Sequence, residues 1–164
     1  MNVLTINTGS SSIKYEVLDA ATGDPVTRGL VEDLMTPEAF QAGVKTLIAV
    51  AQQHKVDAVG HRVVHGGNAY SDAVRIDNQV IDNIEHWSAL APLHNPRNLA
   101  GIRALMSAMP DIPHVAVFDT AFHATLPRRA STYAIDQKMA VKHKIRRYGF
   151  HGTSHQYVAQ EAAK

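Results

Sequence analysis

Hydrophobic and polar positions alternate along the first thirty residues in a pattern typical of short strands. Residues 3–6 and 13–18 are rich in β-forming side chains and flank a tight turn of small residues at 8–12, as in a hairpin. A second turn at residues 21–25 precedes a further apolar run at 26–31. The chain therefore begins with three predicted antiparallel strands.

The spacing then changes to that of helices. Residues 36–38, Thr-Pro-Glu, form a helix-start signal, and apolar residues recur at helical spacing as far as His54. Asn95-Pro96 repeats the cap-then-proline signal and predicts a second helix, which Pro110 stops. A third helix is predicted from Gly152 to the last residue.

Two short, largely apolar runs, 56–64 and 114–118, have the length and composition of buried strands, and a short strand is possible near Tyr133. The order β-β-β-α-β-α-β predicts an α/β fold with a mixed sheet. Its three N-terminal strands are antiparallel and its later strands run parallel, with helices between them.

Composition excludes several classes of protein. The 164 residues suit one domain and perhaps part of a second, and 16 Lys+Arg against 15 Asp+Glu give no broad charge for nucleic acid or an anionic membrane. The absence of cysteine excludes disulfides, thiolate catalysis and Cys-ligated zinc. With neither a signal peptide nor an apolar run of membrane length, we expect a cytoplasmic protein.

The turn at residues 7–14 is the first candidate for chemistry. Tight turns of small residues expose backbone N–H groups that suit phosphate oxygens, and the hydroxyls of Ser10 and Ser12 add donors. Lys14 adds a positive charge, and the amide oxygen of Asn7 is of the kind that magnesium accepts. The alternative is an ordinary hairpin with an exposed lysine.

The segment 61–67 carries two histidines and an arginine. His61 and His65 would be roughly 13 Å apart on a strand, too far to share a metal ion. Arg62 can instead hold a carboxylate or an acyl phosphate in bidentate fashion. The alternative is a surface arginine in a loose ion pair.

Three further residues lie where chemistry is common. Asp119 follows a buried strand and can orient or deprotonate a nucleophile or help hold a metal, or else cap the next turn. His151, flanked by glycines before a helix, can donate to a phosphoryl group, or else be a surface histidine. A structural role is favoured for His94, and a solvated face for the basic segment 142–147. Together these residues form an inventory for phosphoryl transfer.

Five motifs in the same order resemble the acetate kinase family: Asn-Thr-Gly-Ser-Ser-Ser-Ile-Lys (7–14), His-Arg-Val-Val-His-Gly-Gly (61–67), Ala-Pro-Leu-His-Asn-Pro (91–96), Phe-Asp-Thr-Ala-Phe-His (118–123) and Tyr-Gly-Phe-His-Gly-Thr-Ser-His (148–155). The resemblance runs through all 164 residues but covers only the N-terminal part of family members. It implies reversible, ATP-dependent phosphorylation of acetate to acetyl phosphate by direct in-line transfer, with Mg²⁺, on an actin/sugar-kinase-like (RNase H-like) fold.

The resemblance also implies a role for each matching residue. Asn7 would contact magnesium, and the nucleotide phosphates would be bound by Lys14, Ser10 and Ser12. Arg62 would hold the carboxylate or acyl phosphate. Asp119 would be the acid/base or positioning carboxylate. His151 would stabilise the transition state, Val64, Leu93 and Phe150 would form the pocket for the acyl methyl group, and His94 would line the site.

Two departures from the family bear on function. The adenosine-binding segments, a second active-site arginine and a magnesium-site glutamate belong to the part of the family that this chain does not match, and the interval before Arg62 is shorter by some tens of residues. By analogy, residues 1–121 form the N-terminal kinase domain on the substrate and phosphate side. Residues 122–164 would begin a second, less stable domain. A homodimer is possible for the full-length parent.

Two alternatives stay open at this point. A kinase for propionate or another short-chain carboxylate differs only in pocket volume, and one methylene is worth about 1–3 kcal/mol of discrimination. The other alternative is a catalytically incomplete fragment that lacks the nucleotide-binding half.

Overall fold

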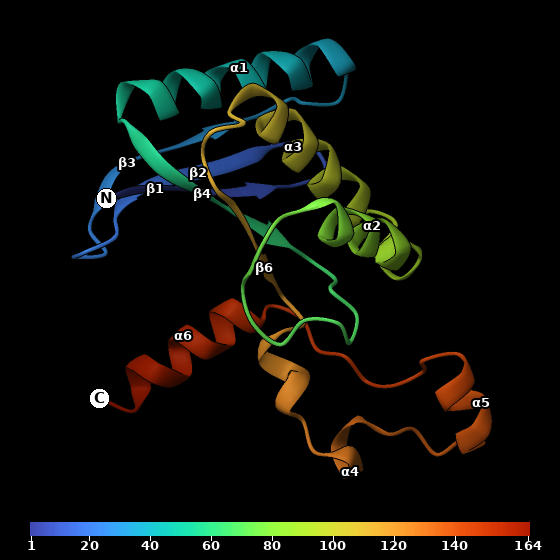
Figure 1. Cartoon of the computed structure of the whole chain (residues 1–164). Coiled ribbons are helices and arrows are strands. Elements are labelled where there is room, and N and C mark those ends of the chain that lie inside the picture. The colour runs from blue at the N-terminus through green and yellow to red at the C-terminus, as the bar shows by residue number, and fades with distance from the viewer.

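A six-stranded mixed sheet organises the computed structural model, which describes residues 1–164 (Figure 1). Its strands are β1 (Asn2–Thr8), β2 (Ile13–Asp19), β3 (Pro25–Val31), β4 (Val56–Val63), β5 (Val74–Arg75) and β6 (His114–Phe118), in the order β3-β2-β1-β4-β6-β5. The first three strands pair antiparallel, whereas β4 and β6 continue the sheet in parallel with β1. The predicted fold class is therefore confirmed.

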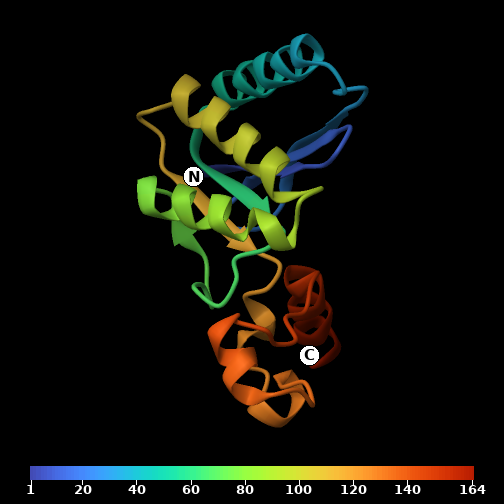
Figure 2. The ribbon, with the colours of Figure 1, turned by 90° about the vertical axis from the view of Figure 1, so that its right-hand side faces the viewer.

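Helices cover one face of this sheet and continue below it. The helices are α1 (Pro37–Gln53), α2 (Asn78–Trp87), α3 (Asn95–Ala108), α4 (Arg128–Ser131), α5 (Gln137–Lys142) and α6 (Gly152–Ala162), with 3₁₀ turns η1 (Ser88–Leu90) and η2 (Phe122–Thr125). Figures 1 and 2 show α1, α2 and α3 over one face, and α4, α5 and α6 grouped at the far end of β6. None of these helices combines the length and apolarity that crossing a membrane requires.

Two buried clusters hold the sheet to its helices. The first packs Leu4 and Val17 of the sheet against Leu47 of α1, and the second packs Phe118 against Ile102 of α3. Every buried member of both clusters lies between Leu4 and Ala121. Residues 122–164 therefore add little to the apolar core, and the domain boundary expected after residue 121 stays a prediction.

The structure differs from the sequence-based prediction in several details. The short elements β5, α4 and α5 were not predicted, and β5 pairs antiparallel with β6 although the later strands were expected to be parallel. α2 was not predicted, although Asp77 caps it and Val80, Ile84 and Trp87 form its buried face. No strand forms at Tyr133, which lies between two short helices without a neighbouring strand. α3 begins at Asn95 rather than after it, because the Asn95 side chain bonds to a neighbouring loop instead of capping the helix.

A buried histidine pair joins β4 to β6. His61 Nε2 lies 2.9 Å from His114 Nδ1, and His114 Nε2 lies 3.2 Å from the Met109 carbonyl oxygen. Both bonds are satisfied when each ring is neutral with its proton on Nε2. Burial lowers the pKa of both imidazoles, that of His61 to about 3, with repulsion from His114 adding to the effect.

This pair predicts that acid destabilises the fold. The unfolded chain takes up protons on these histidines near their ordinary pKa of 6.5, while the folded chain does not. The free energy of unfolding should therefore fall below that pH, and continue to fall toward pH 3 for His61, by up to about 1.4 kcal/mol per pH unit for each histidine. Urea unfolding across this range measures the slope. His61→Asn should flatten it, and the exposed-site control His143→Gln should not. An unchanged slope in His61→Asn would contradict this assignment.

Candidate functional site

The carboxyl ends of three adjacent parallel strands bring polar side chains to one edge of the sheet. Asn7 is near the end of β1, Arg62 near the end of β4, and Asp119 directly follows β6. β4 pairs in parallel with both β1 and β6, so these ends are neighbours. Open α/β sheets present ligand sites at this edge.

A bidentate ion pair between Arg62 and Asp119 lies at the centre of the edge. Arg62 Nε donates to Asp119 Oδ1 at 2.9 Å, and Nη2 donates to Oδ2 at 2.6 Å. The Asp119 side chain is 1% exposed, whereas that of Arg62 is 32% exposed. The hydrogen bond and the charge of Asp119 outweigh the effect of burial and raise the pKa of the Arg62 guanidinium. Arg62 therefore forms a bidentate pair with a buried carboxylate, and not the loose surface ion pair that was the alternative.

The remaining donors of Arg62 point toward two other predicted residues. Nη1 donates to Asn7 Oδ1 at 3.2 Å, and Nη2 approaches His151 Nδ1 at 3.2 Å. A guanidinium has five N–H groups, and the two bonds to Asp119, the bond to Asn7 and the contact with His151 engage four of them. One N–H on Nη1 is left without a partner. Because the guanidinium can only donate, Nδ1 of His151 must accept, and the proton of the neutral imidazole is then on Nε2.

The backbone at the start of α6 fixes His151 beside this pair. His151 adopts a left-handed conformation with φ 55°, and the N–H of the next residue, Gly152, donates to the Asp119 carbonyl at 3.0 Å. A Cβ at position 152 would lie 2.4 Å from that carbonyl oxygen. Glycine is thus required for α6 to approach Asp119, and the His151 side chain, 70% exposed, stays open to ligand.

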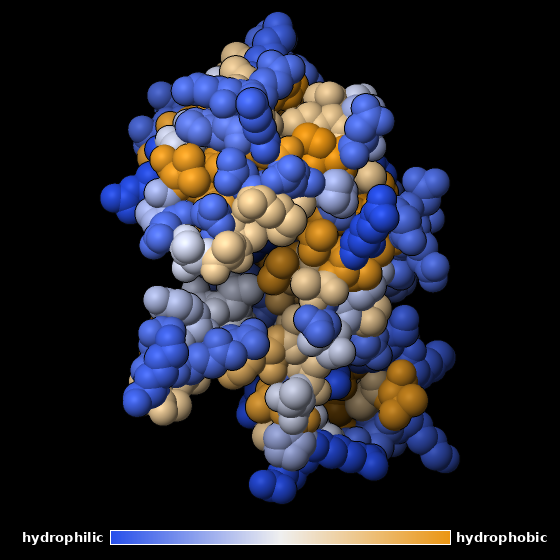
Figure 3. Space-filling model, turned by 60° about the vertical axis from the view of Figure 1, so that its left-hand side comes forward, coloured by the Kyte–Doolittle hydropathy of each residue, from blue (hydrophilic) through white to orange (hydrophobic).

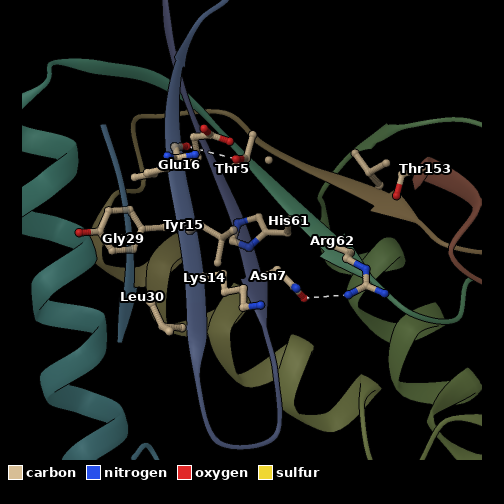
Figure 4. A pocket seen from close by; sticks show the side chains of 14 residues that line it. Thr5, Asn7, Lys14, Tyr15, Glu16, Gly29, Leu30, His61, Arg62 and Thr153 are labelled. Atoms are coloured by element: carbon tan, nitrogen blue, oxygen red, sulfur yellow. Dashed lines mark hydrogen bonds between the residues drawn. The ribbon is translucent and has the colours of Figure 1, made fainter. Parts of the chain in front are cut away.

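Two hollows meet at Arg62. The larger, about 640 Å³, extends over the sheet face opposite α1 and is lined by Asn7, Lys14 and Thr153 among others (Figure 4). The space-filling view shows the surface hollowed between the sheet and the lower part of the molecule (Figure 3). Its polar end, near Asn7 and Lys14, suits phosphate oxygens.

The smaller hollow, about 510 Å³, collects most of the predicted substrate residues. It is lined by Arg62, Asp119 and His151, by Val64, Leu90, Ala91, Pro92, Leu93 and Phe150, and by His94. Its lining combines the Arg62–Asp119 ion pair with apolar side chains. Such a hollow suits a small molecule with an anionic head and a short apolar tail.

The turn before β2 is only partly joined to this arrangement. Lys14 pairs with Asn7 across the β1–β2 ladder and reaches the larger hollow. Ser10 and Ser12 line neither hollow, and the Ser12 carbonyl accepts the Gly9 N–H at 2.8 Å within the turn. The structure therefore does not bring the two serines to the other site residues.

The residues at this edge do not fit a magnesium ion by themselves. The amide oxygen of Asn7 and both carboxylate oxygens of Asp119 each accept a hydrogen bond from the Arg62 cation, whose positive charge opposes a second cation beside them. The chain has no group of three His, Asp or Glu side chains placed to hold a metal. The magnesium contact expected for Asn7 stays a prediction.

Two buried asparagines of α3, which the sequence did not single out for a site, tie the strand ends together. Asn98 accepts from the Val64 N–H at 3.2 Å and donates to the Thr8 carbonyl at 2.9 Å. Asn95 accepts from the His65 N–H at 3.0 Å and donates to the His65 carbonyl at 2.9 Å. Because Thr8 follows Asn7 of the larger hollow and Val64 lines the smaller hollow, Asn98 joins the backbone of the two hollows.

The comparisons with known proteins agree on one family. The model of the Acetokinase family matches residues 2–49 and 38–164. The acetate kinase of Thermosipho africanus is 46% identical over 100% of this chain and 47% of its own length, and that of Pseudarthrobacter chlorophenolicus is 47% identical over 99% and 46%. The chain thus spans about half the length of the curated relatives it matches.

Solved structures give the same result. The crystal structure of Porphyromonas gingivalis acetate kinase superposes with a TM-score of 0.88 at 39% identity, covering 98% of this chain and 48% of that one. A propionate kinase from Francisella tularensis superposes with a TM-score of 0.89 at 37% identity, covering 99% of this chain and 48% of that one.

The alignment with the Thermosipho africanus acetate kinase spans 192 positions for the 164 residues here, so that relative carries residues that this chain lacks.

The asparagine contacts predict a large effect of one substitution. Asn98→Ala leaves the Val64 N–H and the Thr8 carbonyl without partners, and each orphaned buried group costs about 1–3 kcal/mol. We expect the free energy of unfolding to fall by that much per group in denaturant titration. The exposed Asn78 provides the control, because Asn78→Ala should change stability by no more than about 0.5 kcal/mol. Equal effects of the two substitutions would contradict the role of Asn98.

Proposed function

The chain belongs to the acetokinase family, and on that premise we propose that it forms the acyl-substrate side of an acetate kinase. The proposed reaction is reversible transfer of the γ-phosphoryl group of ATP to acetate, giving acetyl phosphate. The observation that carries the proposal is the convergence of Arg62, Asp119 and His151 in the smaller hollow, which meets the larger hollow at Arg62.

We assign Arg62 to the substrate carboxylate and the transferring phosphoryl group. Its Nε edge is committed to Asp119, so the Nη1–Nη2 edge is the one that faces ligand. In the free structure this edge contacts Asn7 and His151, both at 3.2 Å. An anion with two oxygens would displace these longer, weaker contacts and gain charge-assisted bonds.

We assign Asp119 a positioning role rather than that of a base. Acetate is already ionised near neutral pH, so its oxygen can attack phosphorus without losing a proton. The buried Asp119 carboxylate instead fixes the orientation of Arg62 through both of its oxygens. Of the two roles expected for Asp119, acid/base or positioning, we therefore propose positioning.

We assign His151 to charge developing on the phosphoryl oxygens. With Nδ1 accepting from Arg62, the Nε2–H is the free donor of the ring. The left-handed backbone at His151 holds the ring at the mouth of the site without a further partner for Nε2. A donor held in place in this way stabilises a transition state without reorganising.

The phosphate side of the reaction is proposed for the larger hollow. Lys14 would pair with the nucleotide phosphates in this hollow, and Asn7 would lie between these phosphates and Arg62. ATP, supplied with Mg²⁺, would need residues beyond those of this chain for its adenosine. We propose residues 1–121 as the substrate-side domain and residues 122–164 as the start of the second.

Propionate is the second candidate substrate, and two observations favour keeping it. The Francisella neighbour is a propionate kinase and superposes as well as the acetate kinase does. The walls of the smaller hollow are also open, since Leu93 is 74% and Phe150 43% exposed. The additional methylene group of propionate would therefore not clash with a buried side chain.

Binding of acetyl phosphate to the 164-residue chain tests the substrate side. Arg62→Ala removes the charge-assisted contacts and should weaken binding about 10–100-fold by calorimetry. Arg103→Ala is the matched control, because Arg103 pairs with Glu85 on the surface and lines neither hollow. Equal affinity in Arg62→Ala and the unaltered chain would contradict the assignment.

Turnover tests the reaction itself. Joined to the C-terminal half of the Thermosipho acetate kinase, the chain should release ADP from ATP and Mg²⁺ only when acetate is present, and Asp119→Ala should abolish this release. We expect the chain alone to be silent. Acetate-dependent release from the joined protein that survives Asp119→Ala would overturn the role of Asp119.

A further inference from the structure

The charge of the chain is divided sharply at residue 121. Residues 1–121 contain eight Lys and Arg against thirteen Asp and Glu, whereas residues 122–164 contain eight against two. The near-neutral total therefore conceals a strongly basic C-terminal lobe. Such an asymmetry between two parts of one chain makes the basic part a candidate for binding an anion, in place of the solvated face favoured from the sequence for residues 142–147.

Part of this charge surrounds a third hollow. It measures about 430 Å³ and is lined by Arg128, Lys144 and Arg146, with Asn68, Ser131, Thr132, Gln137 and Tyr148 as polar neighbours and Ala140, Val141 and Ile145 as apolar ones. No carboxylate lines it, and none lies within 4.0 Å of the three cations. It shares no lining residue with either of the two hollows at the proposed catalytic edge, which is the edge of the sheet that carries Arg62 and Asp119.

The three cations are not all freely moving surface groups. Lys144 Nζ lies 5.1 Å from the centre of the Trp87 ring, and the Arg146 guanidinium lies 5.7 Å from that of Tyr148. Contacts of this kind favour one placement of a long side chain without neutralising its charge. Two of the three positive groups are thereby held beside the hollow at full charge.

The backbone at Lys144 supports the same conclusion. Lys144 and Ile145 close α5 with paired bonds, from the Lys144 N–H to Val141 O at 3.2 Å and from the Ile145 N–H to Ala140 O at 2.8 Å. This helix-ending motif places Lys144 in the left-handed region, at φ 53°, where glycine is usual. A lysine at this position has a less favourable backbone conformation than glycine would have, and its side chain places a cation over Trp87 beside the hollow.

We propose that this hollow binds a small anion carrying two or more phosphate charges, at a site separate from the catalytic edge. The guanidinium groups of Arg128 and Arg146 can each bind two phosphate oxygens. Lys144 adds a positive charge, and Thr132 adds a hydroxyl donor. A concave site of this size suits a compact ligand, whereas nucleic acid would follow an extended cationic stripe. The proposal does not depend on the proposed kinase function.

Calorimetric titration of the 164-residue chain with inorganic pyrophosphate tests the proposal. Arg62→Ala is used as the background, so that any anion bound at the catalytic edge is weakened and the two sites are told apart. We expect one site per chain in this background. The double substitution Arg128→Gln/Arg146→Gln should weaken it about 10–100-fold.

The control carries the same change of charge elsewhere in the lobe. Arg129 and Lys138 are exposed and do not line the hollow, so Arg129→Gln/Lys138→Gln should leave the affinity within about twofold. Far-ultraviolet circular dichroism shows whether each variant folds, and the single substitution Arg128→Gln serves if the double variant does not. Equal losses in both double variants, the absence of a one-to-one site, or tighter binding of a single-stranded oligonucleotide that needs Arg129 and Lys138 would overturn the proposal.

Discussion

The ion pair between Arg62 and Asp119 is the interaction on which the site depends. Its carboxylate is almost fully buried, so it is stable only while the guanidinium satisfies both oxygens. The pair commits one edge of Arg62 to the protein and turns the other toward ligand. Removing either partner would leave a buried charge or a freely rotating arginine, and the two hollows would lose the group they share.

The fold supplies this pair through three separate supports. The parallel register of β4 and β6 places Arg62 next to Asp119, α3 fixes the strand ends through Asn95 and Asn98, and the α6 backbone closes on the Asp119 carbonyl at Gly152. All of the apolar core that holds these supports lies on the sheet side of the chain. The chain thus brings Asn7, Arg62, Asp119 and His151 together in about half the length of its relatives.

Local patterns predicted the strands around the first turn, α1, α3 and the two buried parallel strands, because each has its own periodicity and end signals. The rule that ligand sites lie at strand carboxyl ends also singled out Asp119. What the sequence could not give was the partner of each polar group. An asparagine before a proline can cap a helix or bridge to a loop, and Asn95 does the latter because the loop after β4 passes beside it. The contact of Asn7 with Arg62 likewise depends on strand order, which is not a local property.

The most direct test of this account is the Arg62 Nε–H resonance in a ¹⁵N-correlated nuclear magnetic resonance spectrum of the free chain. A proton held between Nε and Asp119 Oδ1 should exchange slowly and give a resolved signal, assigned by its disappearance in Arg62→Lys. The account predicts that Asp119→Asn shifts this signal or broadens it beyond detection, while the Asn78→Ala variant keeps it. A signal that is absent from the unaltered chain, or that Asp119→Asn leaves unmoved, would contradict the central role of the pair.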